Sequence, residues 1–203
     1  MKNYKIVQLS DIHIGPSIDL DDFDEILKLA LLQKPNRVVI TGDLIDKLAW
    51  LPQVCERLTT FAKQIPDGVD FILGNHEYHH DVNKVLDALK RNTPMNILVN
   101  SNIQIMGGKQ PVYIAGVAYD NDRKKDNREA MINKALSGIP DYAFVILLAH
   151  HPEFFEESIE RKIPLTLSGH THGGQIVFMG MPLVPTGTPY TKGRYVAVSY
   201  THL

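Results

Sequence analysis

Short apolar runs recur along this chain, and several of them end abruptly in a cluster of polar residues. The run Arg37–Ile40 stops at Thr41-Gly42-Asp43, and the run Phe144–Leu148 stops before His150-His151. Apolar runs of this length predict strands, and segments such as Asp21–Gln33, with apolar residues at helical spacing, lie between them. Strands that alternate with helices favour an α/β fold with at least partly buried strands.

The same patterns predict the remaining elements of the chain. Further strands are expected at Ile6–Leu9, Asp70–Leu73, Ile97–Val99, Asn102–Ile105, Val112–Val117, Leu165–Leu167 and Tyr195–Ser199. Further helices are expected at Pro52–Gln64, Val82–Arg91 and Asn127–Ala135. The segment Gly180–Gly193 is rich in Gly, Pro and Thr, so it is expected to form a long loop.

Length and composition restrict the class of protein. A chain of 203 residues suffices for one domain with a sizeable core, so residues 1–203 are expected to form a single domain. The net charge of −2 argues against a strongly basic surface, and no stable nucleic-acid partner is expected. The single cysteine, Cys55, excludes an intrachain disulfide and a cysteine-rich zinc module. With no membrane-length apolar run and no visible signal peptide, the expected location is cytoplasmic or peripheral to a membrane. The oligomeric state stays open.

Eight of the nine histidines lie in or just after five polar clusters at the ends of strand-like runs. The clusters are Asp11/His13, Asp43/Asp46, Asn75/His76, His150/His151 and His170/His172. Ligands bind beyond the carboxyl ends of the strands in open α/β sheets, so clusters far apart in the sequence can converge on one site.

The residue types in these clusters are Asp, His and Asn, and no thiolate is among them. This donor set suits Mn²⁺, Fe or Zn²⁺ and is wrong for an Fe–S cluster or Cu(I). A single catalytic zinc takes three protein ligands plus water, whereas seven donors are present here: Asp11, His13, Asp43, Asn75, His150, His170 and His172. Two ions that share one carboxylate would use them all, and two-metal sites recur in phosphoester hydrolysis.

Five short motifs also carry a resemblance to a known family. They are Asp11-X-His13, Gly42-Asp43-X-X-Asp46, Gly74-Asn75-His76-Glu77, His150 and Gly169-His170-Thr-His172. In order and spacing, from about residue 6 to residue 178, they resemble the motifs of the calcineurin-like metallophosphoesterase superfamily. The wider sequences around His76 and His170 look most like its bacterial single-domain phosphodiesterase subgroup, which is often tethered to membranes. The resemblance implies a four-layer sandwich of two packed mixed β-sheets flanked by helices.

The resemblance implies a role for each residue. Two ions would be bridged by Asp43, with Asp11, His13 and His172 on the first and Asn75, His150 and His170 on the second. A hydroxide activated by the ions would attack phosphorus. His76 would stabilise the phosphoryl oxygens and protonate the leaving oxygen, and Asp46 would orient the ring of His76. If the backbone at Asp11 and His13 is extended, both side chains face the same side.

The implied function is a dinuclear metal-dependent phosphoesterase. Its substrate would be a phosphodiester or a lipid- or nucleotide-linked diphosphate, with diesters preferred over monoesters because no cap is evident. One alternative is a scaffold that kept the fold and lost catalysis; such a chain would be expected to lack Asp43, Asn75 or His76, and all three are present. Another is a nuclease of the same superfamily, which a near-neutral single domain disfavours. Members of the subgroup usually continue past the last strand, so the C-terminus is expected to be either truncated or non-native in its final residues.

Several other residues have both a functional and a structural interpretation. His79 and His80 could line a substrate entrance, although an exposed loop pair is the more common arrangement. His151 is expected to support its neighbour His150 or to lie on the surface. Lys192 and Arg194 follow the last motif and could contact a substrate phosphate, or they could simply be solvated. Cys55 is expected in the core.

Overall fold

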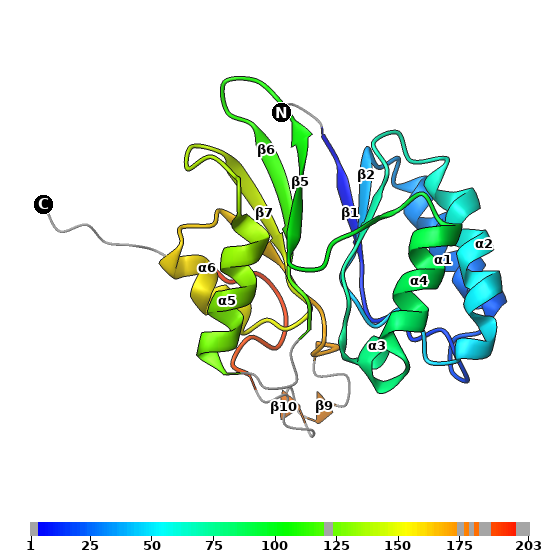
Figure 1. Ribbon diagram of the computed structural model, residues 1–203. Helices are drawn as coiled ribbons and strands as arrows, with labels where there is room; N and C mark the ends of the chain where they lie inside the picture. Colours follow the sequence, from blue (N-terminus) through cyan, green and yellow to red (C-terminus); the bar gives the residue numbers. More distant parts are fainter. Residues whose placement is uncertain (1–3, 120–123, 174–176, 179–180, 183–187, 198–203) are drawn as a thin grey trace, which may run out of the picture.

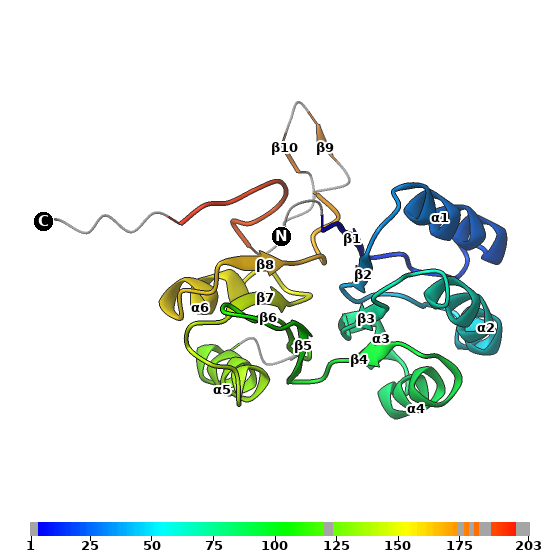
Figure 2. The same ribbon diagram turned by 90° about the horizontal axis from the view of Figure 1, so that it is seen from above.

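The computed structural model describes residues 4–119, 124–173, 177–178, 181–182 and 188–197. Within these residues, two four-stranded sheets pack face to face, and helices cover the outer face of each sheet (Figure 1). Viewed from above, the order of layers is helices, sheet, sheet, helices (Figure 2). The predicted α/β class, with two packed sheets flanked by helices, is confirmed.

The first sheet is parallel throughout its described strands, whereas the resemblance implied a mixed sheet, and it is built from the N-terminal half of the chain. Its strands, in spatial order, are β1 (Ile6–Leu9), β2 (Arg37–Ile40), β3 (Val69–Phe71) and β4 (Asn96–Ile97). Parallel neighbours require crossover connections. These connections contain α1 (Leu20–Leu32), the 3₁₀ turn η1 (Leu48–Trp50), α2 (Leu51–Ala62), α3 (Asn75–His79) and α4 (Val82–Asn92). The carboxyl ends of β1, β2 and β3 therefore meet at one edge, the lower edge in Figure 1.

The second sheet mixes parallel and antiparallel pairs. Its order is β5 (Ser101–Met106), β6 (Val112–Gly116), β7 (Phe144–Leu148) and β8 (Leu165–Leu167). Only β5 is antiparallel to its neighbour, so β6, β7 and β8 also end at a common edge. The helices α5 (Lys125–Leu136) and α6 (Phe154–Glu160) pack on the outer face.

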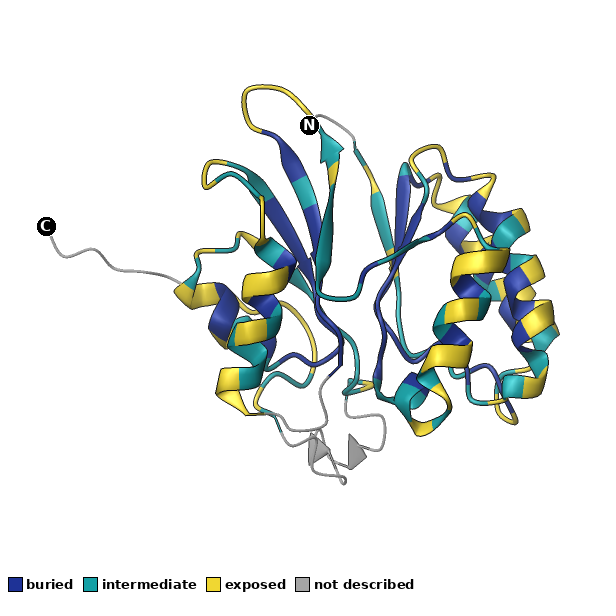
Figure 3. Cartoon of the chain, in the orientation of Figure 1, coloured by how far each residue is buried: buried dark blue, intermediate teal, exposed yellow. Residues whose placement is uncertain are grey.

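The strands alternate between two apolar interfaces because successive side chains point to opposite faces of a sheet. In β2, Val38 and Ile40 pack with the core beneath α1, α2 and α4, whereas Val39 belongs to the core between the sheets. In β7, Leu147 faces α5 and α6, while Ile146 faces the first sheet. Figure 3 shows the result, with buried strands in the middle and exposed outer helix faces.

The start of helix α1 is determined by its local sequence. The Asp19 carboxylate accepts the backbone N–H groups of Asp21 and Asp22, and the Asp22 side chain accepts the N–H of Asp19 in return. This capping box satisfies N–H groups that the helix start leaves free. Cys55 of α2 is buried in the core of the first half, as predicted.

Several sequence predictions differ from the structure. The short helices α3 and α6 were not predicted, and the expected loop Gly180–Gly193 contains the two-residue strand β10 (Met181–Pro182), which pairs with β9 (Val177–Phe178). The expected strand Tyr195–Ser199 is wrong over Tyr195–Ala197, which have no strand structure, and its last two residues lie outside the described residues. Tyr195 and Val196 are exposed, so their apolar character does not reflect packing in a sheet.

Among the described residues, no helix combines the length and the apolar composition that crossing a membrane requires.

Candidate metal centre

The predicted site residues gather where strands of both sheets end. The loops after β1, β2 and β3 supply one group, and the loops after β7 and β8 supply the other. All nine residues join one connected set of contacts: Asp11, His13, Asp43, Asp46, Asn75, His76, His150, His170 and His172. The convergence that the strand-end pattern predicts is therefore present.

The carboxylate of Asp43 lies at the middle of this set and is almost fully buried. Its Oδ2 lies 3.2 Å from Nε2 of His150, 3.7 Å from Nε2 of His13 and 3.9 Å from Nε2 of His76. Its Oδ1 accepts the backbone N–H of His76 at 2.8 Å. One carboxylate of the first sheet therefore faces imidazoles that come from both halves of the molecule.

Asp43 and His150 shift each other's protonation in opposite directions. Burial alone raises the pKa of Asp43, but the hydrogen bond and charge of His150, with a smaller contribution from His76, lower it to about 2. Burial likewise lowers the pKa of His150, yet the contact with the Asp43 carboxylate leaves it raised above 6.5. Nδ1–H of His150 donates to the carbonyl oxygen of Thr41 at 2.7 Å, which turns Nε2 toward Asp43.

A first group of donors consists of Asp11, His13 and His172. One ligand atom from each lies within 4.8 Å of the others. The Nε2 atoms of His13 and His172 are 3.1 Å apart, and Nε2 of His172 is 3.6 Å from Oδ1 of Asp11. Oxygen and imidazole nitrogen atoms that converge in this way could hold a divalent cation.

A second group consists of Asp43, His150 and His170, whose ligand atoms also lie within 4.8 Å of one another. The amide oxygen of Asn75 extends it, since Oδ1 lies 3.0 Å from Nε2 of His150 and 2.8 Å from Nδ1 of His170. Three side chains from different loops thus meet at one amide oxygen, which makes this second cluster as compact as the first.

Asp46 lies between two imidazole rings. Its Oδ1 is 2.6 Å from Nδ1 of His76 and 3.2 Å from Nδ1 of His13, and the two rings meet edge to face with centroids 4.3 Å apart. The contact with His76 has the geometry expected of an orienting carboxylate. The contact with His13 goes beyond the sequence-based expectation and means that Asp46 supports two rings at once.

The backbone at Asp11 and His13 is not extended, so the condition under which both side chains would face the same side is not met. Positive φ angles occur at Asp11 (53°), His13 (54°), Asp43 (52°), His170 (72°) and His172 (49°). Non-glycine residues rarely adopt this left-handed conformation, which costs energy and is often found at functional sites. The donors converge because the chain turns sharply at the strand ends.

A glycine is required at position 74 because the Asp43 side chain and backbone lie very close to it. A Cβ atom at this position would collide with the carboxylate of Asp43, which packs directly against the glycine backbone. Gly169 has the same role beside Asp11.

Glu77 is a site residue to which the sequence analysis assigned no role. It is fully buried, and its carboxylate accepts the backbone N–H groups of Asp43 at 3.0 Å, Leu44 at 2.7 Å and Gly74 at 2.7 Å. Burial raises the pKa of Glu77, and these donors offset only part of that effect. The available sequence signal was its position within the Gly74-Asn75-His76-Glu77 motif.

The neighbouring histidines differ in their surroundings. His151 is buried, its ring centroid lies 3.8 Å from that of His170, and its Nδ1 is 3.3 Å from Oε2 of Glu153. This agrees with a supporting position and excludes the surface alternative. His79 is exposed, with its ring centroid 4.9 Å from that of His76.

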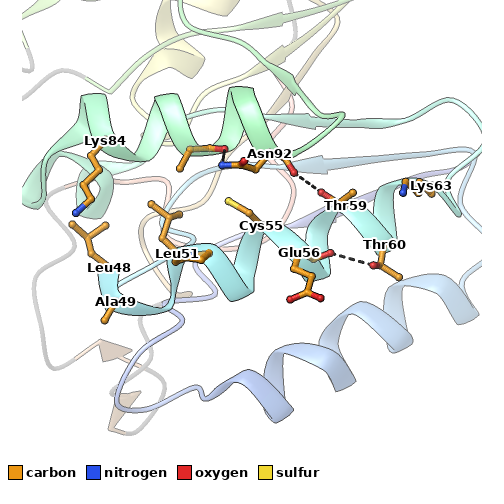
Figure 4. Close-up of a pocket in the computed structure, with 12 residues that line it drawn as sticks. Leu48, Ala49, Leu51, Cys55, Glu56, Thr59, Thr60, Lys63, Lys84 and Asn92 are labelled. Atoms are coloured by element: carbon orange, nitrogen blue, oxygen red, sulfur yellow. Dashed lines mark hydrogen bonds between the residues drawn. The ribbon is translucent and has the colours of Figure 1, made fainter.

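A separate groove of 760 Å³ lies on the helical layer of the first half (Figure 4). It runs along α2 and α4, with Leu48 and Leu51 toward one end and Lys63 toward the other. None of the nine predicted site residues lines it. The groove and the strand-end cluster are therefore distinct features.

Sequence comparison identifies relatives over almost the whole chain. An uncharacterized metallophosphoesterase of Campylobacter jejuni is 36% identical over 96% of this chain and 50% of its own length. The uncharacterized metallophosphoesterase YkuE of Bacillus subtilis is 31% identical over 98% of this chain and 70% of its own length. The chain thus spans about half the length of the Campylobacter protein and 41% of a putative metallophosphoesterase of Caenorhabditis elegans.

Structure comparison agrees at the level of the fold. The NAD nucleotidase of Haemophilus influenzae superposes with a TM-score of 0.52 over 83% of this chain and 38% of its own, at 18% identity. The family model described as calcineurin-like phosphoesterase matches residues 4–174, which include all five motifs and all nine predicted site residues. On this match and these identities, the chain belongs to the calcineurin-like phosphoesterase family.

Proposed function

We propose that this chain is a phosphoesterase that would hold two metal ions, with Asp43 as the residue that would contribute to both. The observation that carries the proposal is the position of Asp43 Oδ2, which lies 3.2 Å from His150 in one donor group and 3.7 Å from His13 in the other. Family membership supports a metal-dependent hydrolase of phosphoric esters. As ligands we propose Asp11, His13 and His172 for one ion and Asn75, His150 and His170 for the other.

The donor chemistry fits this assignment. Carboxylate, amide oxygen and imidazole suit Mn²⁺, Fe or Zn²⁺, and the chain's one cysteine, Cys55, lies in the apolar core rather than at the site. His150 already has its Nδ1–H fixed on the carbonyl of Thr41, as the second nitrogen of a metal-binding imidazole usually is. When bound, two such ions would activate a water molecule and neutralise charge on the phosphoryl oxygens.

His76 is the residue we assign to proton transfer. Asp46 holds Nδ1–H of His76 at 2.6 Å, which leaves Nε2 on the side of the ring that faces Asp43, 3.9 Å from Oδ2. The Asp46 carboxylate fixes the orientation of the ring. The proton on Nε2 passes to the leaving oxygen as the phosphorus–oxygen bond breaks, while the Nδ1 hydrogen bond is kept.

The substrate we propose is a phosphodiester, or a diphosphate linked to a lipid or a nucleotide, in preference to a monoester. Support comes from the motif resemblance to the bacterial phosphodiesterase subgroup. We further propose that residues 1–203 act as one catalytic domain, located in the cytoplasm or at a membrane surface. A nuclease and a non-catalytic scaffold are the competing outcomes of the test.

The test is hydrolysis of bis-p-nitrophenyl phosphate by metal-stripped protein, with Mn²⁺ added back and metal content measured on the same samples. We expect turnover to return with about two ions per chain and to exceed turnover of p-nitrophenyl phosphate. Equal or faster turnover of the monoester would overturn the diester preference. Failure to bind metal and to turn over either ester would favour the scaffold.

A further inference from the structure

The segment that contains Lys192 lies against the loop that carries His170 and His172. The Thr171 hydroxyl between these histidines donates a hydrogen bond to the carbonyl oxygen of Thr191. A Cβ atom added at Gly173 would lie 3.7 Å from Cβ and 3.9 Å from Cδ of Lys192. The aliphatic part of Lys192 therefore already lies over Gly173. Because consecutive Cα atoms are about 3.8 Å apart, this position is immediately beside the donor His172.

Aromatic contacts hold the backbone on both sides of Lys192. The ring of Tyr190 packs edge to face on Phe155 of α6 and on Tyr195, with centroids 5.2 Å apart in each case. The Tyr195 hydroxyl donates to the carbonyl oxygen of Pro189 at 3.3 Å and accepts the N–H of Lys192 at 3.4 Å. The backbone of this short segment is thus fixed, while the Lys192 side chain is exposed.

The charge of Lys192 is available to a ligand. Within the described part of the chain, no carboxylate pairs with it, whereas Lys125, for example, contacts Glu160 at 2.7 Å. Lys47, which follows the site residue Asp46, is already engaged because its Nζ lies 4.0 Å above the ring of Trp50. An unpaired ammonium beside a cluster of metal donors is placed to attract an anionic group.

We propose that Lys192 is a specificity residue that binds a second anionic group of the substrate, next to the phosphoryl group that is hydrolysed. This inference rests on the phosphoesterase function proposed above, and it specifies that the preferred substrate carries more than one negative charge. Diesters that carry a neighbouring phosphate are preferred over diesters with a single negative charge. Lys192 does not take part in bond cleavage, so its contribution falls mainly on substrate binding.

Two esters with the same reacting group test this inference. Thymidine 5′-(p-nitrophenyl phosphate) and its 3′-phosphorylated form share the diester and the leaving group, and they differ only in the remote phosphate. We expect the metal-loaded wild type to prefer the 3′-phosphorylated ester. Lys192→Ala should reduce that preference about tenfold, mainly through KM, and Lys192→Arg should retain most of it. The preference should also weaken as salt is added.

Lys90→Ala is the matched control, because it removes the same charge from an exposed position in the last turn of α4. It should leave the preference unchanged. A wild type without the preference, or a Lys192→Ala variant that loses activity on both esters equally, would overturn the inference while leaving the phosphoesterase intact. Hydrolysis of neither ester by the metal-loaded protein would instead overturn the proposed function, and the inference with it.

Discussion

The buried carboxylate of Glu77 accepts the backbone N–H of Asp43 at 3.0 Å, and this contact joins two loops of the first sheet. The same carboxylate accepts the N–H groups of Leu44 and Gly74. The loop after β2 is thereby held against the loop after β3. Since Asp43 is the most central carboxylate of the site, the position of Glu77 determines where the donors of both loops lie.

Replacing Glu77 by Gln should therefore loosen the site without changing its surface. The amide keeps the size of the side chain but points a donor at backbone N–H groups, so at least one of them loses its acceptor. We expect the free energy of unfolding to fall by about 2 kcal/mol and metal affinity to fall with it. Urea unfolding and metal titration measure the two effects. Glu56→Gln, at an exposed position of α2, is the control. If both variants lost the same unfolding free energy and the same metal affinity, Glu77 would not be holding the two loops together.

His76→Ala should separate catalysis from metal binding. The ring is held by Asp46 and belongs to neither set of proposed metal holders, so its loss removes a proton donor and leaves the ions in place. We expect normal metal content with kcat reduced by roughly 10²–10⁴. Elemental analysis and steady-state kinetics on bis-p-nitrophenyl phosphate provide the measurement. The exposed neighbour His79, changed to Ala, controls for the loss of an imidazole; a similar decrease in kcat there would contradict a special role for His76.

Asp43→Ala should abolish both metal binding and activity. The change removes the oxygen that lies between the two donor groups and leaves His150 without its carboxylate. Isothermal titration with Mn²⁺, combined with kinetics, distinguishes loss of metal from loss of turnover alone. Asp87→Ala, on the exposed face of α4, should bind Mn²⁺ and hydrolyse the ester as the wild type does. Two tightly bound ions in Asp43→Ala would disprove a bridging position.

The metal-free protein should show a pH dependence that comes from Asp43 and His150. The pKa of Asp43 is lowered from 3.8 to about 2. Its contribution to the free energy of unfolding is therefore complete above pH 3.8 and is lost as the pH falls toward about 2. That difference corresponds to about 2 kcal/mol. The pKa of His150 is raised above 6.5, so its contribution is complete below 6.5 and is lost as the pH rises through the folded-state value.

The pair therefore stabilises the metal-free protein most in mildly acidic solution, between the unperturbed values of 3.8 and 6.5. Urea unfolding of metal-free wild type and Asp43→Asn across this range measures the effect. The difference in unfolding free energy between the two proteins should be largest within the range and should shrink on both sides. A difference that stays constant with pH would show that the two groups do not interact as their 3.2 Å separation indicates.

Sequence information predicted the strands well, and it also predicted which side chains would lie close together, for a physical reason. Buried strands such as Arg37–Ile40 and Phe144–Leu148 are mainly apolar runs that end within two residues of a polar cluster, and both are strands with these bounds. The donors immediately follow the strands, so predicting the strand ends also predicted which side chains would meet.

The features that were missed depend on contacts between distant segments. Helix α6 spans only seven residues, and its buried Glu157 is held by Arg128 of α5 at 2.8 Å, which no local pattern reveals. Glu77 acts on backbone groups from two separate loops, so its motif indicates that it matters but not how. Residues Tyr195–Ala197 have the composition of a strand, but composition cannot supply a neighbouring strand.

Each proposed metal-binding set takes residues from both sheets, as Asp43 and His150 illustrate. Neither half of the molecule contains a complete set, and an apolar interface lies between the halves. A displacement of the sheets by about an ångström would separate donor atoms that are now 3 to 4 Å apart. Metal ions at this edge would link the two halves of the molecule. Movement of one half along the other and loss of metal would then be the same event.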